Sequence, residues 1–318
     1  MNTHDHAPRG RGLTIEVGHV TKKYGSEVVV DDLSFIAQPG RVTGFLGPNG
    51  SGKSTTMKIV LDLASADRGT ATVGGVRYRD LSSPARTVGA LIEPNAFHPG
   101  RSGRNHLRIL ADATGIPSAR VQEALDRVGL AGAADRHVGG YSLGMRQRLG
   151  LAAALLGDPP VLILDEPGNG LDPQGIRELR ELLRRRAEDG DTVVVSSHLL
   201  AEVEHLADDL IVLNRGRLVT NGSIAELQES VSLVRTPSPG LLGDILRAAG
   251  GIVTPADQET LIVRLLPNDE IGELAFGAGV PLHELARQSG SLEELFLGWT
   301  SDTLDGVGAR PPAKESVQ

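Results

Sequence analysis

The sequence predicts an α/β fold with an open sheet. Residues 41–46 form a short apolar run typical of a buried strand, a glycine-rich loop follows at 47–55, and residues 56–63 have apolar side chains at helical spacing. Two more apolar runs, at 161–164 and 192–197, have the length of buried strands. Polar residues follow both runs directly, and in open α/β sheets ligands bind at the carboxyl ends of the strands.

The composition excludes several classes of protein. A chain of 318 residues is long for one domain and comfortable for two. Only 3% of the residues are aromatic, so the core must be aliphatic. A net charge of −8 argues against nucleic acid as a partner. Since there is no cysteine, disulfides, thiol catalysis and cysteine-type zinc sites are excluded.

The sequence also argues against direct insertion into a membrane. No apolar run approaches the roughly 20 residues that span a bilayer, and the best candidate, 149–164, is interrupted by two prolines. The amino-terminal residues lack the apolar segment of a secretory signal. We expect residues 1–12 to be a disordered tail, with His4 and His6 solvated rather than metal-bound. The expected location is the cytoplasm, with any membrane reached through a partner.

The glycine-rich loop matches the pattern G-x-x-x-x-G-K-[ST] in full, and it lies between a strand and a helix as the pattern requires. Glycines allow consecutive backbone N–H groups to point at one anion, and the helix start adds the positive end of its dipole. We expect Lys53 to bridge the β- and γ-phosphates of a nucleotide and Ser54 to hold Mg²⁺. The expected phosphate-binding residues are Gly47, Pro48, Asn49, Gly50, Ser51, Gly52, Lys53, Ser54 and Thr55.

Acidic residues follow the strand at 161–164. Asp165 suits a water-mediated contact to the Mg²⁺ ion that Ser54 holds. Glu166 can polarise a water molecule lined up on the γ-phosphorus. His198 lies just past the next buried strand, where a lone histidine is usually structural.

Two further side chains each allow a structural and a functional interpretation. Glu93 ends the strand predicted at 87–92, and the proline after it excludes helical geometry, so it is either an exposed strand-end residue or part of the ligand site. Tyr24 could pack on the sheet edge, or it could stack on an adenine ring.

A helical insert interrupts the predicted sheet. Residues 104–113, 118–128 and 149–156 have helical apolar spacing. Just before the last of these, Ser142 and Gly144 precede an arginine-rich segment. Serine is a natural N-cap and a helix start favours an anion, although these residues alone predict no more than a cap.

Taken in order, these stretches resemble the ATP-binding subunit of an ATP-binding cassette (ABC) transporter, over residues 13–229. A phosphate loop alone would leave kinases and GTPases open, whereas the ordered set does not. The matching parts are Tyr24 as the adenine-stacking aromatic, 47–55 as Walker A, 161–166 as Walker B with its catalytic glutamate, 141–145 as the signature motif in the variant form of drug and antibiotic exporters, Leu171-Asp172 as the D-loop, and His198 as the switch histidine.

The resemblance implies a P-loop NTPase cassette: a RecA-like core with an antiparallel β subdomain and a helical subdomain at about 95–157. It implies ATP and Mg²⁺ as cofactors. It also implies a head-to-tail dimer with a copy or a relative, in which Ser142 and Gly144 of one chain bind the γ-phosphate of ATP held by the other. Glu166 would drive hydrolysis while His198 steadies the γ-phosphate, and Asp172 would lie beside the nucleotide.

The implied partner is a separate membrane permease, which by resemblance docks near residues 95–106. There Phe97 is either a docking anchor or a domain-packing residue. Opening and closing of the dimer would then drive an exporter of the drug or antibiotic type at the cytoplasmic face of the membrane. The alternative is a non-transport ABC ATPase, either an assembly scaffold or a regulatory ATPase.

The chain departs from the common family pattern at two places. Glu93 stands where glutamine is usual, which keeps an oxygen for Mg²⁺ but adds a charge; subunits that resemble bacitracin and lantibiotic exporters share this change. We therefore expect Glu93 to act in catalysis and metal binding. Leu143 and Met145 replace a glycine and a glutamine of the common signature, while the phosphate-binding pair is kept.

Beyond the nucleotide motifs, the sequence resembles the small α+β appendage of daunorubicin-resistance-type subunits. We expect a nucleotide-binding domain at 13–229, an accessory domain at 230–302 and a disordered tail at 303–318. The accessory domain has no catalytic constellation, and its role in dimer contact or regulation stays open. Its predicted strands are 231–235, 261–266 and 281–285, and its predicted helices are 241–249, 269–278 and 292–299.

Overall fold

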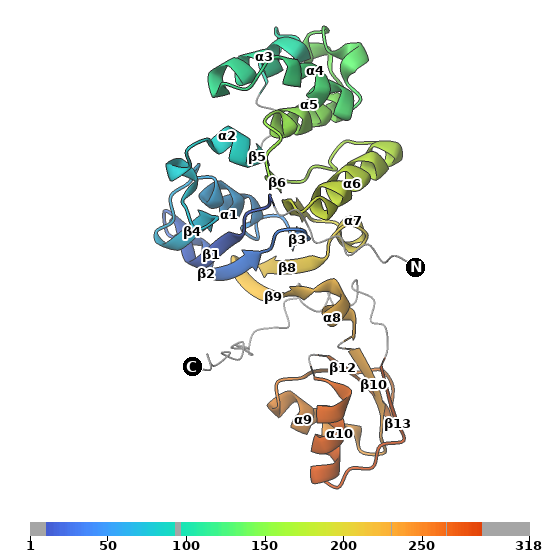
Figure 1. The fold of residues 1–318 in the computed structure, drawn as a ribbon. Coiled ribbons are helices and arrows are strands. Elements are labelled where there is room, and N and C mark those ends of the chain that lie inside the picture. The colour runs from blue at the N-terminus through green and yellow to red at the C-terminus, as the bar shows by residue number, and fades with distance from the viewer. Residues whose placement is uncertain (1–10, 93–96, 230, 265, 288–318) are drawn as a thin grey trace, which may run out of the picture. The chain divides into compact units, whose positions relative to one another are not determined.

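The computed structural model describes residues 11–92, 97–229, 231–264 and 266–287 (Figure 1). The chain divides into two compact units, Met1–Gly222 and Ser223–Gln318. Helix α8 (Ile224–Glu229) belongs to the second of them. The domain boundary expected between residues 229 and 230 stays a prediction.

The first unit is built on a six-stranded sheet with the order β5-β6-β7-β3-β8-β9. From β5 to β8 neighbouring strands pair in parallel. Every residue of β3, β6 and β7 is buried, as in parallel sheets that are covered on both faces. The strands are β3 (Val42–Leu46), β5 (Val88–Leu91), β6 (Val161–Leu164), β7 (Thr192–Ser197), β8 (Asp209–Asn214) and β9 (Arg217–Ser223).

A second, antiparallel sheet with the order β2-β1-β4 completes the first unit. Strands β1 (Ile15–Tyr24) and β2 (Glu27–Ala37) extend well beyond the strands predicted at 13–17 and 33–37, while β4 (Arg68–Val73) ends before a glycine turn. The register of β1 against β2 shifts at three places. These irregularities break the period-two alternation on which the prediction relied.

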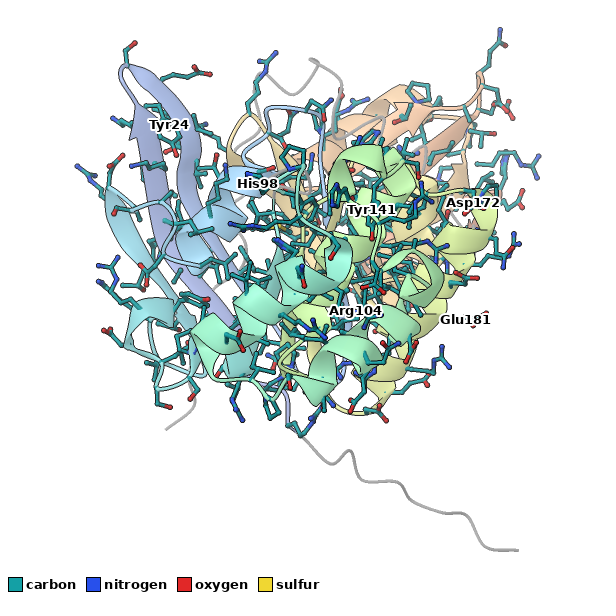
Figure 2. All side chains as sticks on the ribbon, turned by 90° about the horizontal axis from the view of Figure 1, so that it is seen from above. Tyr24, His98, Arg104, Tyr141, Asp172 and Glu181 are labelled. Atoms are coloured by element: carbon teal, nitrogen blue, oxygen red, sulfur yellow. The ribbon has the colours of Figure 1, made fainter. Side chains whose placement is uncertain are left out.

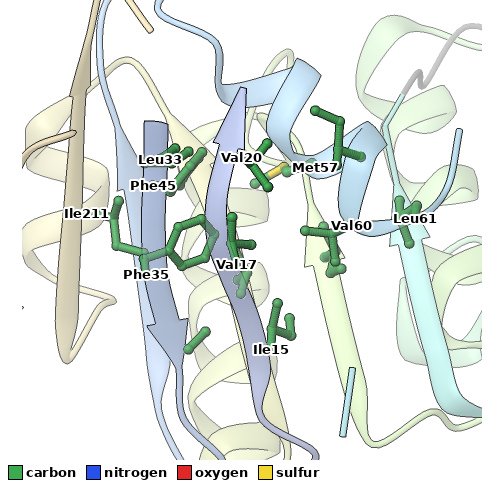
Figure 3. Close-up of a cluster of buried hydrophobic side chains, with 14 of the residues drawn as sticks. Ile15, Val17, Val20, Leu33, Phe35, Phe45, Met57, Val60, Leu61 and Ile211 are labelled. Carbon is green, nitrogen blue, oxygen red and sulfur yellow. The ribbon is translucent and has the colours of Figure 1, made fainter. Parts of the chain in front are cut away.

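The main core lies between the two sheets and helix α1 (Lys53–Val60). The rings of Phe35 on β2 and Phe45 on β3 lie 5.3 Å apart between centroids, and Met57 and Val60 of α1 join the same cluster (Figure 3). Helix α1 starts three residues earlier than predicted. It ends earlier too, because Asp62 takes a left-handed conformation with φ 55°.

Helices cover the other face of the parallel sheet. They are α6 (Pro173–Glu188) and the short α7 (Leu200–Glu204). Helix α7 packs so closely on β3 that a Cβ atom at Gly44 would lie 2.2 Å from Cγ1 of Val203. The short helix α2 (Pro84–Thr87) leads into β5.

The helical subdomain lies between β5 and β6 in the chain. It contains α3 (Gly103–Thr114), α4 (Ala119–Arg127) and α5 (Leu143–Leu155). Helix α5 begins six residues before the helix predicted at 149–156, because Ser142 caps it by accepting from the N–H of Met145. This places the arginine-rich segment inside the helix.

The second unit is a four-stranded antiparallel sheet with the order β11-β12-β10-β13. From β10 to β13 the described elements follow the order βαββαβ, the ferredoxin-like arrangement. Strand β11 was not predicted, β13 begins three residues later than the expected strand, and the helix predicted at 292–299 lies outside the described residues. The elements are β10 (Val231–Arg235), α9 (Pro239–Ala248), β11 (Ile252–Pro255), β12 (Thr260–Arg264), α10 (Asn268–Gly277) and β13 (Glu284–Arg287).

Within the described part of the chain, no helix combines the length and the apolar character needed to cross a bilayer.

Candidate functional site

The glycine loop connects the end of β3 to α1. Gly50 and Gly52 have φ of 81° and 102°, a region that side-chain-bearing residues rarely adopt. A Cβ atom at Gly47 would lie 2.4 Å from the carbonyl oxygen of Leu213, and one at Gly52 would lie 2.7 Å from that of Val29. The loop can therefore take this path only with glycine at these positions.

The donors of this loop fit an anion of the phosphate type. No side chain caps the start of α1, and the first N–H groups of a helix have no partner within it. The hydroxyl of Ser51 is buried and finds no hydrogen-bond partner among the described residues. The loop thus supplies backbone N–H groups and a hydroxyl group that can donate hydrogen bonds to a ligand.

Lys53 is buried at the start of α1, with only 6% of its surface exposed. Its Nζ donates to the carbonyl oxygens of Gly47 at 2.6 Å and Pro48 at 3.2 Å, and it lies 3.9 Å from Oε1 of Glu166. Burial lowers the pKa of Lys53, while the carboxylates of Glu166 and Asp165 act in the opposite direction.

Glu166 lies two residues past the last residue of β6 and contacts two other predicted site residues. Besides Lys53, it meets His198, whose Nδ1 lies 2.8 Å from Oε2 of the carboxylate. Its backbone is left-handed, with φ 49°. The structure therefore brings Lys53, Glu166 and His198 together at the carboxyl ends of β3, β6 and β7.

Asp165 is buried beside this group and accepts a short hydrogen bond from the hydroxyl of Ser196. Ser54, the other predicted metal residue, is exposed on the first turn of α1. Within the described residues no cluster of three or more acidic or histidine side chains could hold a metal ion. Asp165 and Ser54 therefore fit a Mg²⁺ ion only if phosphate oxygens and water complete its coordination.

The predicted signature residues form the start of α5. Ser142 is exposed, and its Oγ accepts from the N–H of Met145 at 3.2 Å. A Cβ atom at Gly144 would lie 2.7 Å from the carbonyl oxygen of Gly170, so this turn lies directly against the D-loop of the same chain. The side chain of Leu143 packs on Gly170 as well.

Asp172 is the N-cap of α6, where its Oδ1 accepts from the N–H of Gly175 at 2.9 Å. Its side chain is largely exposed and lies 4.0 Å from the guanidinium of Arg148. The sequence predicted a nucleotide contact for Asp172. The structure adds a second role, capping of α6, which was not predicted.

Three other predicted residues lie apart from this group or outside the described residues. Tyr24 is at the end of β1, on the opposite side of Figure 2 from Asp172; it is 52% exposed, and the Lys22 ammonium lies 5.2 Å from its ring centroid. Phe97 packs edge-on against the ring of His106 at 4.9 Å. Glu93 is outside the described residues.

Sequence reasoning missed two residues that hold the backbone of Glu166. The hydroxyl of Ser196 accepts from the Glu166 N–H at 2.9 Å, and Nε2 of Gln147 donates to the Glu166 carbonyl oxygen at 2.9 Å. Both residues are buried, but each has polar neighbours in the chain: Gln147 lies between two arginines and Ser196 precedes another serine. No sequence pattern therefore singled them out.

Comparison with known proteins identifies the family. The sequence model for "ABC transporter" matches residues 30–169, and one for a domain of unknown function matches 230–293. An uncharacterized ABC transporter ATP-binding protein of Bacillus subtilis, YhcH, is 36% identical over 307 residues, which cover 92% of this chain and 98% of YhcH. The bacitracin transport ATP-binding protein BcrA of Enterococcus faecalis is 41% identical over 218 residues, 68% of this chain and 71% of BcrA.

The fold agrees with these matches. A solved ATP-binding subunit of an ABC transporter superposes with a TM-score of 0.61 at 27% identity, covering 82% of this chain and 99% of that subunit. The expected cassette fold and its α+β addition are thus confirmed. The chain belongs to the ABC transporter ATP-binding proteins and is an ATP-hydrolysing subunit of such a transporter.

Proposed function

We propose that this chain powers an exporter of the drug or antibiotic type, together with a separately encoded membrane permease at the cytoplasmic face of the membrane. The similarity to a bacitracin transport protein supports this substrate class. The net charge of −8 speaks against nucleic acid as a partner.

The observation that carries the catalytic part of the proposal is the contact of Lys53 and His198 with one carboxylate, that of Glu166. A carboxylate between a cation and a histidine, next to a phosphate-binding loop, suits activation of a water molecule for attack on phosphorus. In this proposal Glu166 orients and deprotonates the water. His198 holds that carboxylate and steadies the γ-phosphate.

The nucleotide would be held mainly by the glycine loop. Backbone N–H groups of residues 47–55 bind the phosphates, and the Lys53 ammonium bridges the β- and γ-phosphates. Ser54 and Asp165 hold Mg²⁺, which neutralises phosphate charge when bound, and Glu93 adds an oxygen to the same ion. The accessible ring of Tyr24 stacks on adenine.

The active unit would be a head-to-tail dimer with a second copy or a related subunit. Ser142 is exposed at a helix start, where N–H groups favour an anion, so it suits the γ-phosphate of a nucleotide on another chain. The backbone N–H of Gly144, in the first turn of α5, would bind the same phosphate, and Asp172 caps the start of α6. Two such contacts would close two equivalent sites.

A dimerisation experiment tests this proposal. The Glu166→Gln variant with ATP and Mg²⁺ should elute as a dimer in size-exclusion chromatography, and adding Ser142→Arg should return it to a monomer. A monomer at saturating ATP in the first variant would contradict the head-to-tail sandwich.

The exporter assignment needs its own test. Affinity purification of the tagged chain from detergent-solubilised membranes should retain a polytopic membrane protein. Full ATPase activity in the complete absence of such a partner would favour an assembly scaffold or a regulatory ATPase instead.

A further inference from the structure

We propose that Gln147 is a positioning residue for Glu166: it holds the main chain of Glu166 in the left-handed conformation that directs the carboxylate to Lys53 and His198. The inference rests on the proposed function of Glu166 as the group that activates water.

The backbone of Glu166 is held by side chains from two different elements. Its φ of 49° is unfavourable for a residue with a Cβ atom, and such a conformation persists only where the surroundings fix it. The N–H donates to Oγ of Ser196 on β7 at 2.9 Å. The carbonyl oxygen accepts from Nε2 of Gln147 on α5 at 2.9 Å and from the N–H of Asn169 at 3.2 Å.

The carbonyl oxygen of the Gln147 amide, Oε1, indicates that this side chain serves function rather than packing. The side chain is 1% exposed, and its Oε1 finds no hydrogen-bond donor among the described residues. A buried acceptor without a partner is destabilising, so an apolar side chain of equal size would serve stability better. The amide is justified by the bond that its Nε2 donates to Glu166.

The same helix start carries Ser142. Gln147 follows Ser142 by five positions, which is about 7.5 Å along a helix axis. Arg148, the next residue, pairs with Glu178 of α6 at 2.9 Å, and Leu143 packs on Gly170. The first two turns of α5 are therefore attached to residues 166–178, which follow β6. A displacement of α5 at Ser142 is transmitted to Glu166 through the Gln147 bond.

The test replaces Gln147 with Met, which has nearly the same shape and donates no hydrogen bond. We expect kcat for ATP hydrolysis to fall about tenfold. The dissociation constant of ATP should stay within about twofold, and the melting temperature should be unchanged or higher because a buried unpaired acceptor is removed. Gln147→Leu is a second variant without a donor, and Gln147→His keeps an N–H and should restore part of kcat.

Gln122→Met on α4 is the matched control, since this glutamine bonds Asp126 on the exposed side of the same subdomain. Wild-type kcat in Gln147→Met would overturn the inference. A loss of kcat that follows a loss of melting temperature and is not restored by histidine would also overturn it, by assigning a structural role only. If instead Glu166→Gln keeps wild-type turnover, the proposed function of Glu166 fails, whatever the Gln147 variants show.

Discussion

The Lys53 ammonium lies 3.9 Å from the carboxylate of Glu166, although their strands are not neighbours in the sheet. Strand β7 separates β3 from β6, and His198 follows β7. The lysine and the glutamate thus meet across the end of the middle strand, and the histidine from that strand contacts the same carboxylate at 2.8 Å. The parallel order of three buried strands is what assembles this group.

Replacing Glu166 with Gln should keep ATP binding and lower turnover by about 10²- to 10³-fold, because the amide has the same size but cannot take a proton from water. Steady-state phosphate release measures this loss. Glu181→Gln, on the exposed face of α6 (Figure 2), is the control and should hydrolyse ATP at the wild-type rate. Unchanged turnover in Glu166→Gln would remove this residue from the water-activating role.

Replacing Lys53 with Ala should weaken ATP binding by about 100-fold, because the only cation placed against the loop carbonyls among the described contacts is lost. Isothermal titration with ATP and Mg²⁺ measures the affinity. Lys58→Ala on the same helix, outside the loop, should bind as the wild type does. An affinity for ATP within about twofold of the wild type in the Lys53 variant would contradict the phosphate assignment.

Most of the parallel core could be predicted from sequence because its strands are continuous apolar runs. The runs at 161–164 and 192–197 coincide with β6 and β7 almost residue for residue. The loop 47–55 was identified by its glycines, whose backbone geometry no other residue adopts easily.

Other features could not be predicted, for physical reasons. Strands β1 and β2 contain register shifts that hide their alternation, and α5 starts where only a capping serine marks the boundary. The contact of Gln147 with Glu166 joins residues 19 positions apart in sequence. Such a contact depends on tertiary packing and produces no periodic pattern of residues in the sequence.

Replacing Asp158 with Asn should destabilise the fold at neutral pH by about 1–2 kcal/mol, because its partly exposed carboxylate accepts from the guanidinium groups of Arg186, Arg127 and Arg11, of which only Arg186 is buried. Burial alone would raise the pKa of Asp158, but these hydrogen bonds outweigh it and hold the pKa well below the ordinary value. Urea unfolding measures the difference from the wild type.

The pH dependence of this difference in unfolding free energy follows from the direction in which the pKa of Asp158 is shifted. A carboxyl group with a lowered folded-state pKa contributes its full stability above its unfolded pKa of about 3.9 and loses it as the pH falls further. The gap between wild type and Asp158→Asn should therefore be constant from pH 7 to about pH 5 and shrink below about pH 4. Asp112→Asn, on the exposed end of α3, is the control. An equal gap at pH 7 and pH 3 would contradict the ion-pair explanation.

Replacing Gly144 with Ala should separate the turn that carries Ser142 from the D-loop. The added Cβ would lie 2.7 Å from the carbonyl oxygen of Gly170, and because this oxygen belongs to the main chain, one of the two segments must shift. We expect a loss of about 1–3 kcal/mol in unfolding free energy, as for other overpacked sites. Turnover should fall by about tenfold or more, since a misplacement near 1 Å is costly to catalysis.

Gly140→Ala is the matched control, because nothing lies within 4 Å of a Cβ atom there. Thermal unfolding and phosphate release on both variants give the comparison. If the two alanine variants behave alike, the close approach of α5 to the D-loop has no part in hydrolysis.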